Sequence, residues 1–378
     1  MLERGRISEP ELVTMLLYTV MGTTFFFLPS VTASFAGRDN WLTPLLAIGP
    51  AFLVTLSTGH LTRRFPGCNF FDWTEIILGK PGGKILQFFY VLWFIHVTSI
   101  IVNEFDYFVR IAFMPLTPSL VFTVLLLFLT GVAVYGGVEM IGRLATVYLP
   151  VSVTMVAGLT FMAAGLYDFN NLRPFLEKGI APVVAGSMPP SGWRSEIFLG
   201  SMLFPFLKHP ERGGRVLFRA DLWLAFFLLV DALSVTLAFG DETARLALPV
   251  FSLAREINLL NFFQHLESVV LVMWFAGIFV KVAVWEYATV LGTARWLNLG
   301  SYRPLVLPLS LLTAALTNYD MPSVVILTHF LASPTPFYLM SFTIVLPGLL
   351  AVLSLLRPGL RPARTRGKGR WAPEADPG

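Results

Sequence analysis

Several side chains that could bind a ligand or an ion lie inside long apolar segments of this chain. Glu196 and Lys281 are two of them, and a third segment carries polar residues at steps of three or four: His96, Ser99, Asn103 and Asp106. An ionised side chain at the centre of a bilayer costs about 2.5–3.5 kcal/mol, so it needs a partner or a function. These groups are suited to binding: a carboxylate can bind an ammonium or a proton, and a lysine ammonium can occupy the place of a metal cation.

Composition defines the class of protein that must position these groups. The chain has 378 residues, of which 55% are hydrophobic and 13% charged, whereas soluble domains carry about 25% charged residues. These values exclude a soluble enzyme, a disordered chain and a nucleic-acid-binding domain, and the single cysteine, Cys68, excludes an internal disulfide. The apolar runs are continuous rather than alternating, which excludes an outer-membrane barrel. An all-α integral membrane protein remains.

Ten apolar segments predict ten transmembrane helices, over residues 10–34, 42–62, 85–112, 118–137, 144–166, 181–207, 216–239, 266–291, 303–318 and 335–356. An even number of spans puts both termini on one side. With the termini inside, 19 Lys and Arg residues lie on the cytoplasmic face and six on the opposite face, which predicts cytoplasmic termini.

The spans predict one transmembrane domain, residues 1–357. Residues 358–378 form a basic cytoplasmic tail that we expect to be disordered and not to bind nucleic acid. The outer loop near 240–264 is expected to hold a short helix, Phe251 to Phe262.

Two spans carry residues that interrupt helices. The first contains Gly22-Thr23-Thr24 and then Pro29, and the sixth contains the run Met188-Pro189-Pro190-Ser191-Gly192. They are the first helices of two five-helix halves and run in opposite directions, which is typical of inverted-repeat transporters with broken helices 1 and 6. The alternatives are that Gly22 serves close helix packing and that the sixth-span run is a loop before a shorter span.

Broken helices at membrane depth expose peptide groups that can bind a ligand. Half-helix N-termini suit a carboxylate, and unwound carbonyls suit an ammonium, so the pattern fits a zwitterionic amino acid. The candidate ligand-binding residues are Gly22, Thr23, Thr24, Ser187, Ser191 and Glu196. For Glu196 the alternative is an ion pair with Arg194 or with a neighbouring helix.

Lys281 is the candidate ion-site or gating residue. Its ammonium is predicted to bridge the first and eighth spans where related folds hold a sodium ion. The alternative is a structural pair with Glu286 or Glu196, and one cation can serve both purposes.

In the third span, His96, Ser99, Asn103, Asp106 and Arg110 fall within an arc of about 80° on one helix face. This stripe predicts the lining of an outer vestibule. The alternative is a buried helix whose polar side faces inward, with Asp106 and Arg110 paired at the rim. Glu104 lies off the stripe and receives no role.

Enzyme signatures are missing from the sequence: it has no glycine-rich phosphate loop, no H-E-x-x-H and no G-x-S-x-G. Its five histidines lack metal-ligand spacing. We therefore expect no catalysis, no cofactor and no metal site.

The residues from Ile7 to Leu356 resemble the B subunit of bacterial spore germinant receptors, within the amino acid–polyamine–organocation transporter superfamily. The resemblance rests on an ordered set of short motifs: Gly22 with Leu28-Pro29, Asp39-Asn40-Trp41, Phe65-Pro66, Ile77-Leu78-Gly79-Lys80 with Gly83, Pro115-Leu116-Thr117-Pro118, the stretch Gly137 to Arg143 with Pro150, Leu172-Arg173-Pro174 with Gly179, Glu196 with Pro205-Phe206, and Phe279-Val280-Lys281.

The resemblance implies a LeuT-like fold of two inverted five-helix repeats in the inner membrane of a dormant spore. It further implies that the protein senses a small nutrient, usually an amino acid, and acts with a larger membrane subunit and a lipoprotein subunit. An amino acid permease, in which proton coupling is one option, is the alternative, since sensor and carrier would bind the same ligand.

Overall fold

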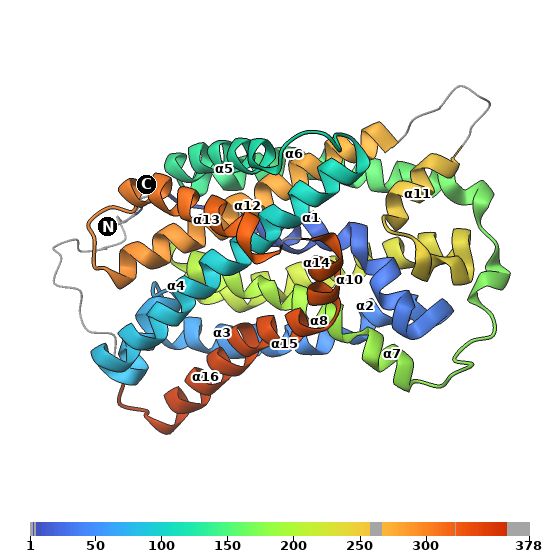
Figure 1. Cartoon of the computed structure of the whole chain (residues 1–378). Coiled ribbons are helices and arrows are strands. Elements are labelled where there is room, and N and C mark those ends of the chain that lie inside the picture. The colour runs from blue at the N-terminus through green and yellow to red at the C-terminus, as the bar shows by residue number, and fades with distance from the viewer. Residues whose placement is uncertain (1–2, 4, 258–266, 322, 361–378) are drawn as a thin grey trace, which may run out of the picture.

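The chain is helical throughout the part that the computed structural model describes, which is residue 3 and residues 5–257, 267–321 and 323–360. The long helices are α1 (Glu9–Ala36), α3 (Ile48–Arg64), α4 (Phe70–Ala112), α5 (Ser119–Gly136), α6 (Val138–Met162), α10 (Gly213–Phe239), α12 (Glu267–Trp296), α13 (Val306–Asp320) and α16 (Leu346–Leu356). The shorter helices are α2 (Thr43–Leu46), α7 (Ala181–Gly186), α8 (Met188–Arg194), α9 (Gly200–Leu203), α11 (Pro249–Glu256), α14 (Val324–Ala332) and α15 (Pro334–Met340). Helix α1 lies centrally, packed against α6, α10 and α12 (Figure 1).

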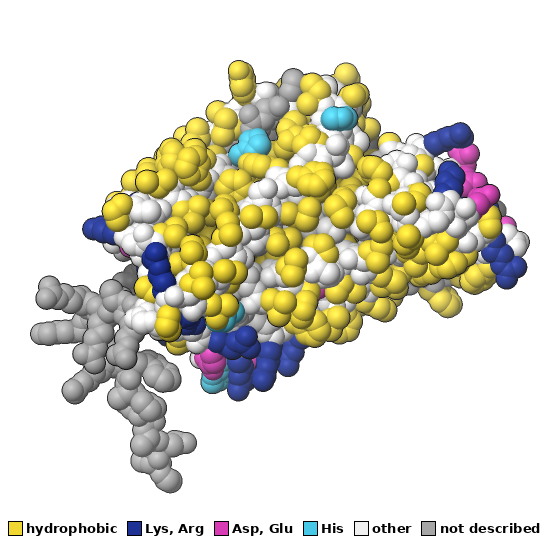
Figure 2. Space-filling view, turned by 90° about the horizontal axis from the view of Figure 1, so that it is seen from below, with side chains coloured by type: hydrophobic (Ala, Val, Ile, Leu, Met, Phe, Trp, Pro, Cys, Tyr) yellow, Lys and Arg dark blue, Asp and Glu magenta, His cyan; other side chains and the backbone are white. Residues whose placement is uncertain are grey.

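Seven helical stretches in the described residues are long and apolar enough to cross a membrane, and one of them, Glu9–Arg64, contains both α1 and α3. Large apolar side chains such as Leu53, Phe89 and Phe128 point outward and are more than half exposed. On the face shown in Figure 2, hydrophobic side chains cover the middle and charged side chains lie near the margins. This distribution is that of a multi-pass integral membrane protein.

The predicted break in the first span is wrong, because α1 is one continuous helix from Glu9 to Ala36. Gly22 serves helix packing instead: a Cβ built on it would lie 3.0 Å from the carbonyl oxygen of Gly277 and 3.0 Å from Cβ of Lys281, both on α12. A glycine inside a helix costs about 1 kcal/mol, and close packing of two helices offsets that cost. Pro29 is accommodated within the helix.

The predicted sixth span is interrupted only by changes between α-helical and 3₁₀ segments. Ser187, Ser195, Gly200 and Phe204, which join the segments, keep right-handed helical φ and ψ, so this interrupted span is irregular rather than unwound as predicted. It runs through α7, α8, the 3₁₀ segment Ser195–Leu199, α9 and a final 3₁₀ turn, Phe204–Phe206. Pro189 and Pro190 fall in the first turn of α8, where proline is tolerated because the first N–H groups of a helix have no partner within it. The Pro-Pro run is therefore part of a helix rather than a loop before it.

The third span begins earlier than predicted, at Phe70, and turns sharply at Gly79, whose φ of +77° favours glycine. The two pieces of α4 then pack so closely that a Cβ on Gly83 would lie 2.7 Å from Cα of Glu75. These contacts explain the glycines of the Ile77–Gly83 motif.

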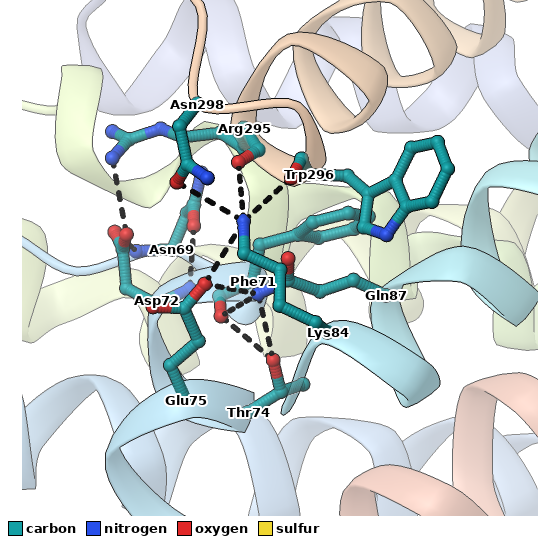
Figure 3. Close-up of polar contacts among 10 residues, drawn as sticks. All are labelled: Asn69, Phe71, Asp72, Thr74, Glu75, Lys84, Gln87, Arg295, Trp296 and Asn298. Atoms are coloured by element: carbon teal, nitrogen blue, oxygen red, sulfur yellow. Dashed lines mark hydrogen bonds and ion pairs between the residues drawn. The ribbon is translucent and has the colours of Figure 1, made fainter. Parts of the chain in front are cut away.

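A polar cluster fixes this bend against the end of α12 (Figure 3). The Lys84 ammonium donates to the carbonyl oxygens of Arg295 and Trp296, at 2.9 and 2.6 Å, and lies 3.2 Å from the Glu75 carboxylate. The Arg295 guanidinium donates to Asp72 at 3.0 Å. A cation on the last carbonyls of a helix also interacts favourably with its dipole, so the cluster caps α12.

Two further segments differ from expectation, and a third is not tested. The short helix of the outer loop is Pro249–Glu256, and the rest of its predicted range from residue 258 lies outside the described residues. The last span consists of α15, a π-helical turn (Ser341–Val345) and α16, and α14 precedes it. The basic tail from residue 361 lies outside the described residues.

Candidate ligand site

Lys281 joins three segments that are far apart in the sequence. Its ammonium donates to Oγ1 of Thr23 on α1 at 2.9 Å and lies 3.1 Å from Oε2 of Glu196 in the sixth span. The indole N–H of Trp285 donates to the same carboxylate at 3.2 Å. Lys281 is only 1% exposed. Charge pairing and hydrogen bonding together therefore stabilise three ionisable or polar groups that would be costly alone in the membrane.

The geometry combines the two interpretations of Lys281, since it connects α1 to α12 and also pairs with Glu196. Glu286, the other predicted partner, lies elsewhere: its carboxylate accepts a hydrogen bond from Thr130 at 2.6 Å and another from Ser310. Those contacts connect α12 to α5 and α13.

Arg194 does not neutralise Glu196, although the two residues are close in sequence. Its guanidinium forms an ion pair with Asp221 on α10 and donates to the carbonyl oxygen of Pro44 at 2.5 Å. Both side chains of the pair are fully buried. Arg194 thus attaches α8 to α10 and to the start of the second span. The charged partner of Glu196 is Lys281 instead.

A small cavity of about 20 Å³ lies beside this cluster, among α1, α4, the sixth span, α14 and α15. That volume holds about one water molecule. The side chains that line it are Thr23, Val97, Ile100, Ile101, Glu104, Trp193, Glu196, Leu331, Thr335, Tyr338 and Leu339. Two carboxyl groups, three hydroxyls and two aromatic rings therefore meet in one small, mostly apolar space. Apolar walls with a few convergent polar groups are typical of small-molecule sites.

Glu104 is the functional candidate that the sequence argument left without a role. It is 4% exposed, it lines the same cavity as Thr23, and its Oε2 has no partner among the described residues. Its neighbours at positions i−3, i−4 and i−7, namely Ile101, Ile100 and Val97, line the same cavity. The available signal was the cost of a carboxylate in mid-span, which applies to Glu104 as it does to Glu196.

The structure brings only two of the six predicted ligand residues, Thr23 and Glu196, to this cavity. Gly22 faces α12, and Thr24 is buried with a hydroxyl that has no partner among the described residues. The hydroxyls of Ser187 and Ser191 donate to the carbonyl oxygens of Val184 and Ser187, each at 2.7 Å, within the α7–α8 turn. A ligand role for these four residues stays a prediction.

The polar stripe of α4 packs against α13 and α15 in this conformation. His96 Nδ1 lies 2.7 Å from the Tyr338 hydroxyl, and the Asn103 amide donates to the carbonyl oxygen of Thr317 at 2.8 Å. Asp106 is 3.1 Å from Arg110, and Ser99, Asn103 and Asp106 are buried. These contacts are those of the buried-helix interpretation, and lining of an outer vestibule stays a prediction.

A second, much larger cavity of about 1000 Å³ lies between the N-terminal segment, the turn after α3, the end of the sixth span and the end of α12. Its charged lining residues are Glu3, Arg6, Lys208, Glu211 and Arg295. Phe206 and Leu291 also line it, and neither lines the small cavity. The ligand candidate site and this wide opening are thus separate spaces.

We predict that Gly22→Ala separates α1 from α12. The added Cβ meets a backbone oxygen that cannot rotate away, and overpacking of this kind costs typically about 1–3 kcal/mol. The thermal unfolding midpoint of the purified full-length protein is expected to fall. Gly49→Ala is the control, since a Cβ there meets nothing within 4 Å. Equal midpoints for both variants would contradict the packing role.

The interrupted sixth span, the buried charges between helices and the all-helical architecture define a membrane protein with a transporter fold. The fold is similar to that of Mhp1, a nucleobase-cation-symport-1 family transporter solved in a closed conformation with bromovinylhydantoin bound, with a TM-score of 0.63 at 13% identity, covering 93% of this chain and 79% of that one.

Sequence comparison places the chain within that class. Residues 6–325 match the family model described as spore germination protein, and the chain belongs to this family. It is similar to spore germination protein KB of Bacillus subtilis (strain 168), with 27% identity over 302 residues, 78% of this chain and 79% of the relative. Spore germination protein A2 of the same strain is 24% identical over 305 residues, 78% and 82% of the two chains. The family comprises germination proteins with a transporter fold and not enzymes.

Proposed function

We propose that this protein is the nutrient-sensing subunit of a spore germinant receptor and that it binds a small ligand, an amino acid in the first instance, in the cavity beside Glu104 and Glu196. The observation that carries the proposal is the meeting of Lys281, Thr23, Glu196 and Glu104 at an interrupted span. Buried ionisable groups at membrane depth mark binding sites and ion pathways in membrane proteins.

The architecture we propose is the inverted five-plus-five repeat in a single domain. Counting α1 and α3 separately, and adding the interrupted segment 181–206 and α13, gives ten crossings. The excess of Lys and Arg on the side of the termini supports cytoplasmic termini, and the family supports a location in the spore inner membrane or the cytoplasmic membrane.

Signalling follows if the ligand favours one of two arrangements of the repeats. The described arrangement is closed, because its cavity holds about one water molecule. A ligand shifts the equilibrium only by its difference in affinity for the two states, and about 3 kcal/mol of difference shifts it roughly 150-fold. Lys281, which connects α1 to α12, is the group whose contacts such a shift would change.

We further propose that the signal passes to partner subunits, a larger membrane protein and a lipoprotein. The relatives are named as germination proteins, and germination is a response of the spore rather than of one chain. Genes for these two partners beside the gene for this chain would support the proposal.

The second candidate function is an amino acid permease, with proton coupling as an option. Two observations favour it: the transporter fold, and carboxylates on both sides of the closed cavity. The wide cavity at the opposite end of α12 would then be the inner exit.

A thermal-shift screen of the purified full-length protein against the twenty amino acids tests ligand binding, because a ligand at 100 times its Kd stabilises the folded state by about 2.7 kcal/mol. We expect one or a few amino acids to raise the unfolding midpoint. Uptake of the same labelled amino acid into proteoliposomes then separates the functions: uptake favours the permease, and binding without uptake favours the sensor. No stabilisation by any amino acid would contradict both.

A further inference from the structure

The small cavity has one more negative group than positive. Two carboxyl groups, Glu104 and Glu196, line it, and none of its described lining residues is a lysine or arginine. Lys281, the cation beside it, is already shared between Glu196 and Thr23. His96 on α4 is not among the residues that line the cavity, and its Nδ1 lies 2.7 Å from the Tyr338 hydroxyl.

Glu104 is the group left incompletely satisfied. The Thr23 hydroxyl, which lines the cavity together with Glu104, accepts a hydrogen bond from Lys281. Oε2 of Glu104 is buried and has no partner among the described residues. A buried carboxylate oxygen without a donor is costly, so the site has a place for one additional positively charged donor.

Among the described residues, the backbone amides of α1 and of the start of α8 are not available to a ligand carboxylate. Helix α1 is continuous, so the amides of Gly22 to Thr24 have carbonyl partners within the helix. Pro189 and Pro190 have no N–H, and the next amide, that of Ser191, donates to the carbonyl oxygen of Ser187.

The nearby basic side chains are engaged as well. The ammonium of Lys281 is held by Glu196, and the guanidinium of Arg194 is held by Asp221 on α10. Trp193 and Tyr338 add two aromatic side chains to the cavity wall, and aromatic faces attract cations rather than anions.

We propose that the site recognises its ligand through an ammonium group bound at Oε2 of Glu104 and does not require a carboxylate, so that simple primary amines are ligands. The inference rests on the proposed binding function and adds the chemical class. The amine nitrogen donates to Glu104 and faces the Trp193 and Tyr338 rings, and the hydrocarbon part contacts the apolar residues of α4, α14 and α15.

Two matched probe series of different size test this on the full-length protein. One is L-alanine, ethylamine and propionate, and the other is L-leucine, isoamylamine and 4-methylpentanoate. In each series the amine lacks only the carboxylate and the acid lacks only the ammonium. Binding is measured by calorimetry and by thermal shift. In at least one series we expect the amine to bind within about tenfold of the amino acid, and the acid to bind at least about tenfold more weakly than the amine, since hydrogen bonds to charged groups are strong.

Glu104→Gln keeps the shape of the side chain and removes its charge, so it should weaken amine binding at least about tenfold. Glu286→Gln is the matched control, because Glu286 is also a buried carboxyl but lies among Thr130 and Ser310, away from the cavity. It should change amine binding by less than about twofold.

The outcomes distinguish failure of the ammonium assignment from failure of the proposed sensor function. Amino acids that bind while both amines fail, or amine binding that survives Glu104→Gln, would overturn the ammonium assignment and leave the sensor proposal standing. If no probe of either series binds, the ammonium assignment is overturned, and the screen of the twenty amino acids then tests the sensor proposal by itself. If the Glu104→Gln variant does not fold, the affinities of the unmodified protein for the amine and the acid still test whether the ammonium group is the part of the ligand that is recognised.

Discussion

Lys281→Ala is expected to destabilise the protein and to abolish the germination response or make it constitutive. The substitution leaves Glu196 buried with the Trp285 indole as its one remaining donor among the described residues, and removing one partner of a buried ion pair costs about 3–5 kcal/mol. It also removes the contact between α12 and Thr23 on α1. Thermal unfolding measures the first effect, and germination of spores that carry the variant measures the second.

Two further variants separate charge from packing. Lys281→Met with Glu196→Gln removes both charges and keeps much of the volume, so it should recover much of the lost stability, because neutral pairs avoid the desolvation penalty. Lys80→Ala is the matched control, since Lys80 is exposed beside the Gly79 bend. A Lys281→Ala spore that germinates normally would remove Lys281 from the mechanism.

The energetic cost of charge in a membrane made part of the site predictable. Glu196 and Lys281 stand out in apolar spans, and the structure pairs them. The same rule applies to Glu104, but the argument from periodicity directed attention to the polar stripe beside it, which the structure shows packed against α13 and α15. Periodicity gives the face of a helix and does not give the neighbour which that face meets.

The two predicted helix interruptions show where local sequence is sufficient for a prediction and where it is not. Pro189 and Pro190 constrain their own backbone, so the irregular sixth span follows from the sequence. A glycine at position 22 is compatible with a helix break and equally with the close approach of α12. The position of Gly277 against Gly22 shows that its role is close helix packing. The close contact at Gly22 comes from residues more than 250 positions away, and a single sequence does not reveal it.

Arg194 is the clearest case of a partner hidden from the sequence, and Arg194→Met is expected to cost about 3–5 kcal/mol of stability, because it leaves Asp221 charged and fully buried. The guanidinium also holds the carbonyl oxygen of Pro44, so its loss frees α8 from two neighbours.

The effect should reach the ligand site as well, because Glu196 lies two residues beyond Arg194 in the interrupted span and is positioned by it. Unfolding midpoints and amine affinities of the purified protein measure both effects. Arg219→Met is the control, since Arg219 forms an exposed pair with Glu9, and such pairs contribute about 0–1 kcal/mol. Replacing both buried partners, by Arg194→Met with Asp221→Leu, should be milder than the single change. A single variant as stable as the Arg219 control would mean that the pair does not hold the sixth span in place.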